Sequence, residues 1–377
     1  MKPALKKSDA AVAREAFHER LRRENLCEGY SYDEGGFITR PYWPLEPKND
    51  VAPHLWPASS LKSCVRAAGD LVGLGHGRLK YDRRVLALIN PGLPNEFTTS
   101  GPLFADIQLL KRGERAPCHR HTPCAARFVM EGKGWTSVAG ERVNLLPGDI
   151  VFTGMFPWHD HGNDQEADFL FLDVLDIPLL YHVGASKWEF EYESVTGSRE
   201  NLSQPVAAVD YPNDDYEQAQ LRPRFAPSRR REPADFAHLP WSKLRVSLDH
   251  LKSERGSPHD GILLEMTSTA GGAVGKSMSI FTQLLRKGEE TLAHRHTGAT
   301  IYFVAEGRGE TEIEGKTYAW GPHDVFVVPS WHWHRHASKG GEAVLHSISD
   351  ASLLAKLGLL REQSQNGGAV ADSGWHG

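Results

Sequence analysis

Two short segments of the chain carry histidines at spacings that suit a metal centre. His119 and His121 form a His-x-His pair, and His159 follows about 40 residues later, after a Pro-Gly-Asp turn. Alternate residues of a β-strand point to the same face, so both members of the pair would enter one interior. Three neutral imidazoles on one side of a metal leave the other side open for substrate and dioxygen, which suits non-haem Fe(II). We therefore expect His119, His121 and His159 to bind Fe(II).

The same pattern occurs twice. Residues 119–161 align without a gap onto residues 294–336, at a constant offset of 175, and 16 of the 43 positions are identical. The histidines His294, His296 and His334 repeat the three candidate ligands, so the second copy could hold a second metal. Two copies of one structural unit are the economical interpretation of the repeat.

Short apolar runs in each copy are separated by Gly, Pro and Asp turns every 8 to 12 residues. This spacing predicts antiparallel sandwiches or barrels rather than βαβ units, and jelly-roll barrels of this kind are the cupin architecture. We expect a mainly all-β fold of two tandem jelly-roll β-barrels, with an N-terminal helical arm and a few peripheral helices. The expected domains are an arm with helices at 9–25 and 60–72 (1–95), a catalytic cupin (96–195), a linker (196–245), a second cupin (246–355), and the end of a helix begun at 351 followed by a disordered tail (356–377).

Composition excludes several partners. The 377 residues carry a formal net charge of −5 with both signs interspersed, so a nucleic-acid surface is not expected. There is no run of roughly 18 apolar residues and no signal-peptide pattern at the start, so neither a membrane nor secretion is expected. Four cysteines without a Cys-x-x-Cys pair fit a reducing compartment. We expect a cytoplasmic location.

No acidic residue completes the ligand set. A carboxylate about five residues after the second histidine would suit manganese as well as iron, but Ala126 stands there, and Ile301 in the second copy. A neutral three-histidine set leaves the full positive charge on the metal, which favours an anionic, chelating substrate. The ligand types alone do not exclude zinc, and hydrogen-bonded structural histidines are the alternative to ligands.

From about residue 50 to residue 355 the chain resembles the gentisate 1,2-dioxygenase family of bicupins, which also contains salicylate and 1-hydroxy-2-naphthoate dioxygenases. The first half carries most of the matching motifs: RRVLALINPGL (83–93), HRHT (119–122), RFVMEG (127–132), PGD (147–149), WHDHGN (158–163), LD (172–173) and DIP (176–178). In the second half, GILLE (261–265) and VVPSWHWH (327–334) also match.

The resemblance implies a reaction. The carboxylate and adjacent hydroxyl of a hydroxylated aromatic acid would chelate iron, and both atoms of O2 would be inserted between the carbons that bear those groups, opening the ring to a dicarboxylic keto acid. The resemblance also implies a homotetramer or a dimer, with a C-terminal cupin that is non-catalytic. The substrate could be gentisate, salicylate, a substituted salicylate or 1-hydroxy-2-naphthoate.

Several further residues are candidates for this chemistry. Arg127 lies six residues after His121, an even separation that returns it to the barrel interior, where it would bind the carboxylate. Arg83 matches the second basic position of the family. His161 shares the inward face with His159 and would hydrogen-bond the substrate hydroxyl or oxygen. The other inward candidates are Gln108, Phe104 and Asp173, of which Asp173 could orient a ligand or accept a proton.

Departures from the family pattern bear on the substrate. Cys118 replaces a glutamate, Phe104 replaces a larger Trp or Tyr, and Asp106 replaces a glycine, while the second copy has Tyr302 in place of Arg127. These changes favour a substrate other than plain gentisate, with ordinary drift as the alternative. Two other functions stay open: another metal-dependent cupin enzyme, of the oxalate decarboxylase or sugar isomerase type, and a non-catalytic small-molecule-binding bicupin.

Overall fold

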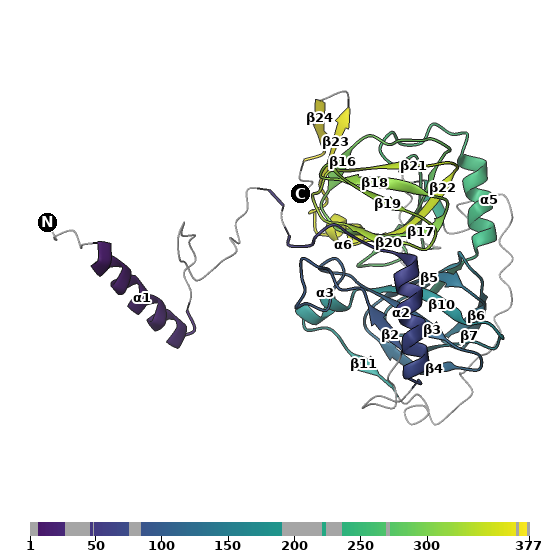
Figure 1. The fold of residues 1–377 in the computed structure, drawn as a ribbon, viewed down its shortest axis with the longest axis horizontal. Coiled ribbons are helices and arrows are strands. Elements are labelled where there is room, and N and C mark those ends of the chain that lie inside the picture. The colour runs from purple at the N-terminus through teal and green to yellow at the C-terminus, as the bar shows by residue number, and fades with distance from the viewer. Residues whose placement is uncertain are drawn as a thin grey trace. The chain divides into compact units, whose positions relative to one another are not determined.

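The computed structural model describes residues 7–26, 46–47, 49–74, 84–190, 221–223, 236–268, 272–366 and 369–374. They fall into two units, residues 1–48 and 49–377. The first unit holds helix α1 (Lys7–Arg23), close to the helix expected over 9–25. The second unit contains both copies of the repeat (Figure 1). Among the described residues, no helix is long and apolar enough to cross a membrane.

The second unit contains two β-barrels, each made of a larger and a smaller antiparallel sheet (Figure 1). The first barrel has sheet orders β13-β8-β5-β10-β3-β2 and β11-β4-β9-β6-β7, and the second has β1-β20-β17-β22-β15-β14-β12 and β19-β18-β21-β16-β23-β24. The strands of the first barrel are β2 (Val85–Ala87), β3 (Phe104–Leu110), β4 (Arg115–His121), β5 (Ala125–Glu131), β6 (Gly134–Val138), β7 (Glu141–Leu145), β8 (Ile150–Thr153), β9 (His159–Gly162), β10 (Phe169–Leu175), β11 (Trp188–Glu189) and β13 (Phe236–Leu239). Those of the second are β1 (His54–Trp56), β12 (Leu221–Pro223), β14 (Ile262–Met266), β15 (Ser279–Leu285), β16 (His294–His296), β17 (Thr300–Glu306), β18 (Gly309–Ile313), β19 (Lys316–Trp320), β20 (Val325–Val328), β21 (His334–Ser338), β22 (Ala343–Ser349), β23 (Glu362–Asn366) and β24 (Ala369–Asp372). The helices are α2 (Ala58–Leu71), α3 (Ile177–His182), α5 (Trp241–Leu251) and α6 (Ala351–Lys356). The predicted all-β bicupin is confirmed.

The larger sheets of the two barrels share one apolar core. Along β5, Ala126 and Phe128 belong to that shared core, whereas Val129 belongs to a separate cluster inside the first barrel. Phe128 stacks on Phe303, its counterpart in the repeat, with ring centroids 5.6 Å apart and an interplanar angle of 12°. Successive side chains of a strand point to opposite faces, so residues adjacent to Phe128, such as Arg127, must face the barrel interior.

The strand that comes just before each barrel in the sequence pairs with a sheet of the other barrel. Strand β1 pairs with β20 of the second barrel, while the helix that follows it, α2, packs on β3 of the first. Reciprocally, β13 pairs with β8 of the first barrel, and Arg245 of the following helix, α5, is paired with Glu342 of the second. This exchange ties the two copies together. It also corrects the expected linker (196–245), because residues 236–245 form part of the fold.

Two repeated aspartates hold the starts of the exchanged helices. Asp324 accepts a hydrogen bond from the backbone N–H of Ala58 at 2.7 Å, and Asp149 accepts one from the N–H of Trp241 at 2.8 Å. The first N–H groups of a helix have no partner within the helix, so these carboxylates act as caps supplied by the other half of the molecule.

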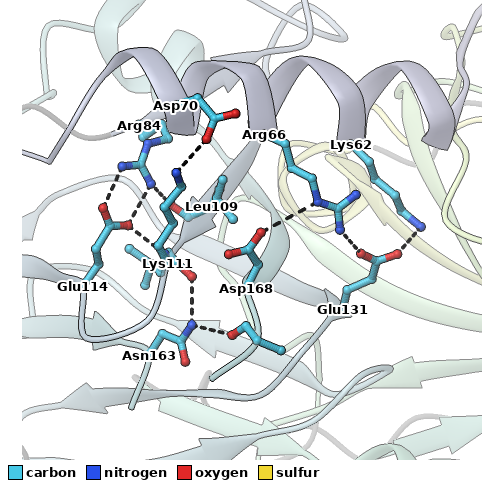
Figure 2. A network of polar contacts seen from close by, with 12 residues as sticks. Lys62, Arg66, Asp70, Arg84, Leu109, Lys111, Glu114, Glu131, Asn163 and Asp168 are labelled. Atoms are coloured by element: carbon cyan, nitrogen blue, oxygen red, sulfur yellow. Dashed lines mark hydrogen bonds and ion pairs between the residues drawn. The ribbon is translucent and has the colours of Figure 1, made fainter. Parts of the chain in front are cut away.

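A polar network fastens α2 to the first barrel (Figure 2). Lys62 and Arg66 both pair with Glu131, each at 2.6 Å. Arg84 donates to both carboxylate oxygens of Glu114, at 2.8 and 2.7 Å, and to the carbonyl of Leu109 at 2.9 Å. Because its side chain is buried and fully engaged, Arg84 anchors the start of β2 against the end of β3.

The C-terminal segment differs from the expectation of a helix end and a disordered tail. Helix α6 stops at Lys356, and Gly358, with a φ of 69°, turns the chain in a left-handed conformation that only glycine adopts readily. Strands β23 and β24 then form a hairpin, and β23 pairs with β16. The Gly, Ser and Asn content of this tail suggested disorder. However, the edge of β16 offers backbone N–H and C=O groups, which can pair with the backbone of a segment of any sequence.

Asp176, at the end of β10, joins the two copies. One carboxylate oxygen accepts the backbone N–H of Cys124 at 2.8 Å and the other accepts the hydroxyl of Ser277. Asp350 occupies the equivalent place in the second copy and accepts the N–H of Ala299 at 3.0 Å. Burial raises the pKa of Asp176 and that of Asp350 to about 6, from an ordinary value of 3.8.

Stability should therefore fall as the pH rises through about 6. The folded state holds these protons more tightly than the unfolded state, so its advantage is greatest at low pH and is lost on ionisation; for Asp176 the loss between pH 5 and 7.5 is roughly 1 to 1.5 kcal/mol. Asp176→Asn mimics the protonated carboxyl and should remove that part of the pH dependence in urea unfolding. Glu254→Gln, at an exposed position, is the control. A pH profile unchanged by Asp176→Asn would contradict this account.

Candidate functional site

The Nδ1 atoms of three histidines each lie within hydrogen-bond distance of a proline carbonyl two residues away. The pairs are His119 with Pro117 at 2.9 Å, His121 with Pro123 at 2.7 Å, and His159 with Pro157 at 2.9 Å. A carbonyl oxygen only accepts, so Nδ1 carries the proton in each ring and Nε2 keeps its lone pair. A hydrogen bond that fixes one ring nitrogen in this way is typical of histidines that bind a metal through the other.

The strands bring these three rings together inside the first barrel. His119 and His159 are directly opposite each other on β4 and β9, with ring centroids 4.1 Å apart. The ring of His121 lies 4.7 Å from that of His159 and 5.4 Å from that of His119. All three side chains are buried. The structure thus gathers the three predicted ligands in one place.

The tightest cluster of histidine nitrogens in this barrel nevertheless includes His161 in place of His121. One nitrogen each from His119, His159 and His161 lie within 4.8 Å of one another, whereas the second copy brings together His294, His296 and His334. A metal could therefore be held by the predicted set or by the set with His161, and the hydrogen bonds of His161 bear on the choice.

His161 is held between a hydroxyl and a guanidinium. Its Nδ1 lies 2.8 Å from the Oγ1 of Thr136, and that hydroxyl donates to the carbonyl of Asp160 at 3.1 Å, so it must accept from His161. Its Nε2 lies 3.1 Å from a terminal nitrogen of Arg127, which can only donate. His161 is thus neutral, with the lone pair of Nε2 directed at Arg127. Thr136 has an identical counterpart in the repeat, Thr311, so the repeat also marks this hydroxyl position.

Arg127 points into the barrel, as its sequence parity predicted. It makes a two-point contact with Asp173, at 2.7 Å for each nitrogen, and Gln108 donates to the same carboxylate at 3.0 Å. The guanidinium lies over the ring of Phe171, 3.9 Å from its centroid. Its remaining nitrogen, Nη1, is buried and has no hydrogen-bond partner within the described part of the chain. A buried donor of this kind is suited to a ligand anion.

These residues line a cavity of about 330 Å3. Its wall includes His121, His159, His161, Arg127, Asp173 and Gln108. Phe104 also lines it, as expected, and stacks on Phe97 with centroids 4.4 Å apart. Flat apolar walls beside a few convergent polar groups suit an aromatic acid. Arg83 lies outside the described residues.

Two wall residues were not assigned a role by the sequence. Trp188 is opposite His121 in the β11–β4 pair, with ring centroids 4.3 Å apart, and only this strand pairing reveals its position. Asp106 is buried in the cavity wall, directly opposite Asp173 on the neighbouring strand. The cavity wall thus carries two carboxyl groups on neighbouring strands.

The second barrel has its own cavity, of about 390 Å3, lined by His294 and His296. Burial lowers the pKa of His294, and that of His334 well below its ordinary value, so both rings are neutral, the state that binds a metal. Tyr302 occupies the place of Arg127, and burial raises the pKa of its hydroxyl. The second barrel therefore repeats the histidines of the first without its arginine.

Comparison with known proteins agrees with this architecture. Residues 106–175 and 281–349 match the cupin domain family. A 5-aminosalicylate 1,2-dioxygenase of Comamonas sp is 35% identical over 364 residues, which cover 93% of this chain and 90% of that one. Gentisate 1,2 dioxygenase 1 of Aquipseudomonas alcaligenes is 33% identical, with 96% and 98% covered.

A solved structure shows the same fold. Salicylate 1,2-dioxygenase from Pseudoaminobacter salicylatoxidans, as an adduct with gentisate, superposes with a TM-score of 0.76 at 26% identity, covering 97% of this chain and 96% of that one. Two cupin domains, this superposition and identities above 30% over nearly the whole chain show that the protein belongs to the gentisate 1,2-dioxygenase family of bicupins, which are ring-cleaving dioxygenases.

Proposed function

We propose that the first barrel holds Fe(II) on His119, His121 and His159 and cleaves the ring of a hydroxylated aromatic carboxylic acid between its carboxyl-bearing and hydroxyl-bearing carbons. The observation that carries the proposal is the set of three rings whose Nδ1 atoms are tied to proline carbonyls, beside a buried arginine with an unused donor. Together they provide a metal site next to an anion site.

Two observations favour His121 over His161 as the third ligand. The tight cluster in the second barrel consists of His294, His296 and His334, the counterparts of the predicted set. In addition, the ring of His161 accepts from Arg127 through its Nε2. In the other three rings the bond to a backbone carbonyl is made by Nδ1, the opposite nitrogen of the ring. His161 is therefore assigned to the substrate and not to the metal.

The residues of the site divide the remaining work. Iron, when bound, supplies the redox chemistry with O2 and the charge that holds a chelating acid. Arg127, oriented by Asp173 and Gln108, offers Nη1 to the substrate carboxylate. The lone pair of the His161 Nε2 accepts from Arg127 in this structure, and it would take the proton of the substrate hydroxyl when Arg127 donates to the substrate instead. The rings of Phe97, Phe104 and Trp188 exclude water and stack on the aromatic ring.

We further propose that the preferred acid carries a hydrogen-bond-donating substituent, such as an amino group, on its ring. Asp106 and Arg127 are two strands apart in the same row of the sheet, roughly 10 Å between backbones, so a ring bound at Arg127 extends toward Asp106. A carboxylate accepts from an amino or hydroxyl group and repels a nitro or carboxyl group. The 5-aminosalicylate activity of the Comamonas relative is consistent with this choice.

The homotetramer and the second basic residue, Arg83, are proposed from the family resemblance, and the cytoplasmic location is proposed from the charged N-terminus and the cysteine content of the sequence. Light scattering of the purified protein would measure the first. For Arg83, loss of acid binding in Arg83→Met with iron retained would support a substrate contact.

Oxygen uptake by the Fe(II)-reconstituted protein tests the reaction. With a panel of gentisate, salicylate, 5-aminosalicylate and 1-hydroxy-2-naphthoate, we expect O2 consumption coupled to loss of aromatic absorbance for at least one acid. His119→Ala should abolish it by removing a ligand, whereas His294→Ala, the matched change in the second barrel, should leave it largely intact. If the metal-loaded protein consumed no O2 with any acid, the decarboxylase, isomerase and binding-protein alternatives would take precedence.

Thr136→Val tests the assignment of His161. Removing the hydroxyl leaves the Nδ1–H of His161 without its acceptor and loosens the ring, so kcat should fall about 10-fold while iron content stays unchanged. Thr311→Val makes the same change beside His336 in the second barrel and should leave kcat unchanged. A loss of iron in Thr136→Val would instead indicate that His161 is a ligand.

Asp106→Ala tests the substrate preference. Loss of the acceptor should lower kcat/KM for 5-aminosalicylate about 10- to 100-fold, because one hydrogen bond to a buried group discriminates by roughly 1 to 3 kcal/mol. The value for unsubstituted salicylate should change less than about 3-fold. Equal losses for the two acids would show that Asp106 maintains the cavity and does not read the substituent.

A further inference from the structure

We propose that the second barrel holds a divalent metal in a chemically different centre, in which the carboxylate of Asp260 joins His294, His296 and His334 as a fourth ligand, and which does not take the aromatic acid. This inference goes beyond the proposed function, since the ring-cleaving centre lies wholly in the first barrel. The added ligand, Asp260, lies outside the histidine repeat.

A buried nitrogen with no hydrogen-bond partner marks the place of the metal. The Nδ1 of His334 lies 3.0 Å from the carbonyl of His332, so it carries the proton, and the lone pair of Nε2 points the other way. That Nε2 is buried and has no hydrogen-bond partner within the described part of the chain. The ring centroid of His334 lies 4.2 Å from that of His294 and 5.4 Å from that of His296. A buried acceptor without a donor is costly, and a cation at this point would satisfy it.

Asp260 supplies an oxygen at ligand distance from this cluster. Its Oδ1 lies 3.6 Å from the Nε2 of His294, longer than a good hydrogen bond. Two ligands each about 2.1 Å from one metal, at a near-tetrahedral angle, lie about 3.4 Å apart. The observed separation is therefore close to that of two ligands that share a metal.

The local backbone aims that oxygen at the cluster. The hydroxyl of Ser257 donates to Oδ2 of Asp260 at 2.8 Å, which leaves Oδ1 on the side of His294. The backbone N–H of Asp260 lies 3.2 Å from the same hydroxyl, and the side chain of Gln283 donates to the carbonyl of Asp260 at 2.8 Å. Gly261 follows with a φ of 64°, which sends the chain from this turn into β14. Such support for a ligand carboxylate is typical of metal sites.

The wall of the second cavity would attract a cation, whereas the first cavity offers an arginine to an anion. Tyr302 and Ser347, which are paired in register, occupy the places of Arg127 and Asp173. Glu362 pairs with His296 where Trp188 pairs with His121. Among the described residues, the lining includes two acids, Asp260 and Glu362, and neither a lysine nor an arginine. Two carboxylates balance a divalent cation, so nothing remains to attract an aromatic anion.

Metal content tests the proposal independently of ring cleavage. We expect the purified chain, loaded with Fe(II) or Mn(II) and dialysed, to hold two metal ions by elemental analysis. Asp260→Asn, which keeps the shape of the side chain, should weaken the second ion at least 10-fold and leave O2 uptake by the first barrel unchanged. His334→Ala should remove that ion, and Glu254→Gln, an exposed acid, should remove none.

Two further measurements keep the outcomes distinct. His119→Ala should lose the other ion together with O2 uptake, so that a failed ring-cleavage assay does not count against the second centre. Anaerobic calorimetry should find one molecule of the active acid per chain even when two metals are present. A single metal per chain in the wild type, retention of both ions by Asp260→Asn, or two acid molecules bound per chain would each overturn the proposal.

Discussion

The alternation of side chains across the larger sheets is the constraint on which both sites depend. Every second residue of β5 and its neighbours must fill the core shared by the two barrels, as Ala126 and Phe128 do. The residues between them are then forced into a barrel interior, which is where Arg127 lies. A one-residue slip of this strand would bury a guanidinium in an apolar core at great cost, so the packing between the copies also fixes the orientation of Arg127.

The two copies differ at matched positions of the larger sheets, where the first has a charged pair and the second an uncharged one. In the first barrel a cation is held against a carboxylate by two hydrogen bonds of 2.7 Å, and one donor remains for a ligand. Such a buried pair contributes little net stability, because desolvation offsets the attraction. Its value is positional, since a fixed guanidinium loses no freedom when an acid binds. The second barrel has an uncharged pair, Tyr302 and Ser347, at the same register and so has lost the anion site while keeping its histidines.

Sequence spacing predicted what depends on strand parity and on the repeat: the two barrels, the histidine clusters and the inward arginine. It could not predict contacts made by segments that are distant in sequence. Trp188 enters the wall only because β11 pairs with β4. Residues 236–245 looked like a linker because their partners, β8 of the first barrel and Glu342 of the second, are distant in sequence. The C-terminal tail was expected to be disordered from its composition, whereas the edge of β16 organises it into a hairpin.

The same distinction explains why the sequence left the role of Asp106 open and gave none to Asp260. Asp106 and Asp260 do not follow the histidine motifs: Asp106 lies on β3 and Asp260 in the turn before β14, in the larger sheets that face the histidine-bearing ones. In each barrel the smaller sheet supplies the clustered histidines, and the larger sheet or the turn before it supplies Asp106 or Asp260 in the cavity wall. The histidine motif is therefore shared by the two copies, while the proposed preference for an anion, or against one, rests on residues that the repeat leaves free to vary.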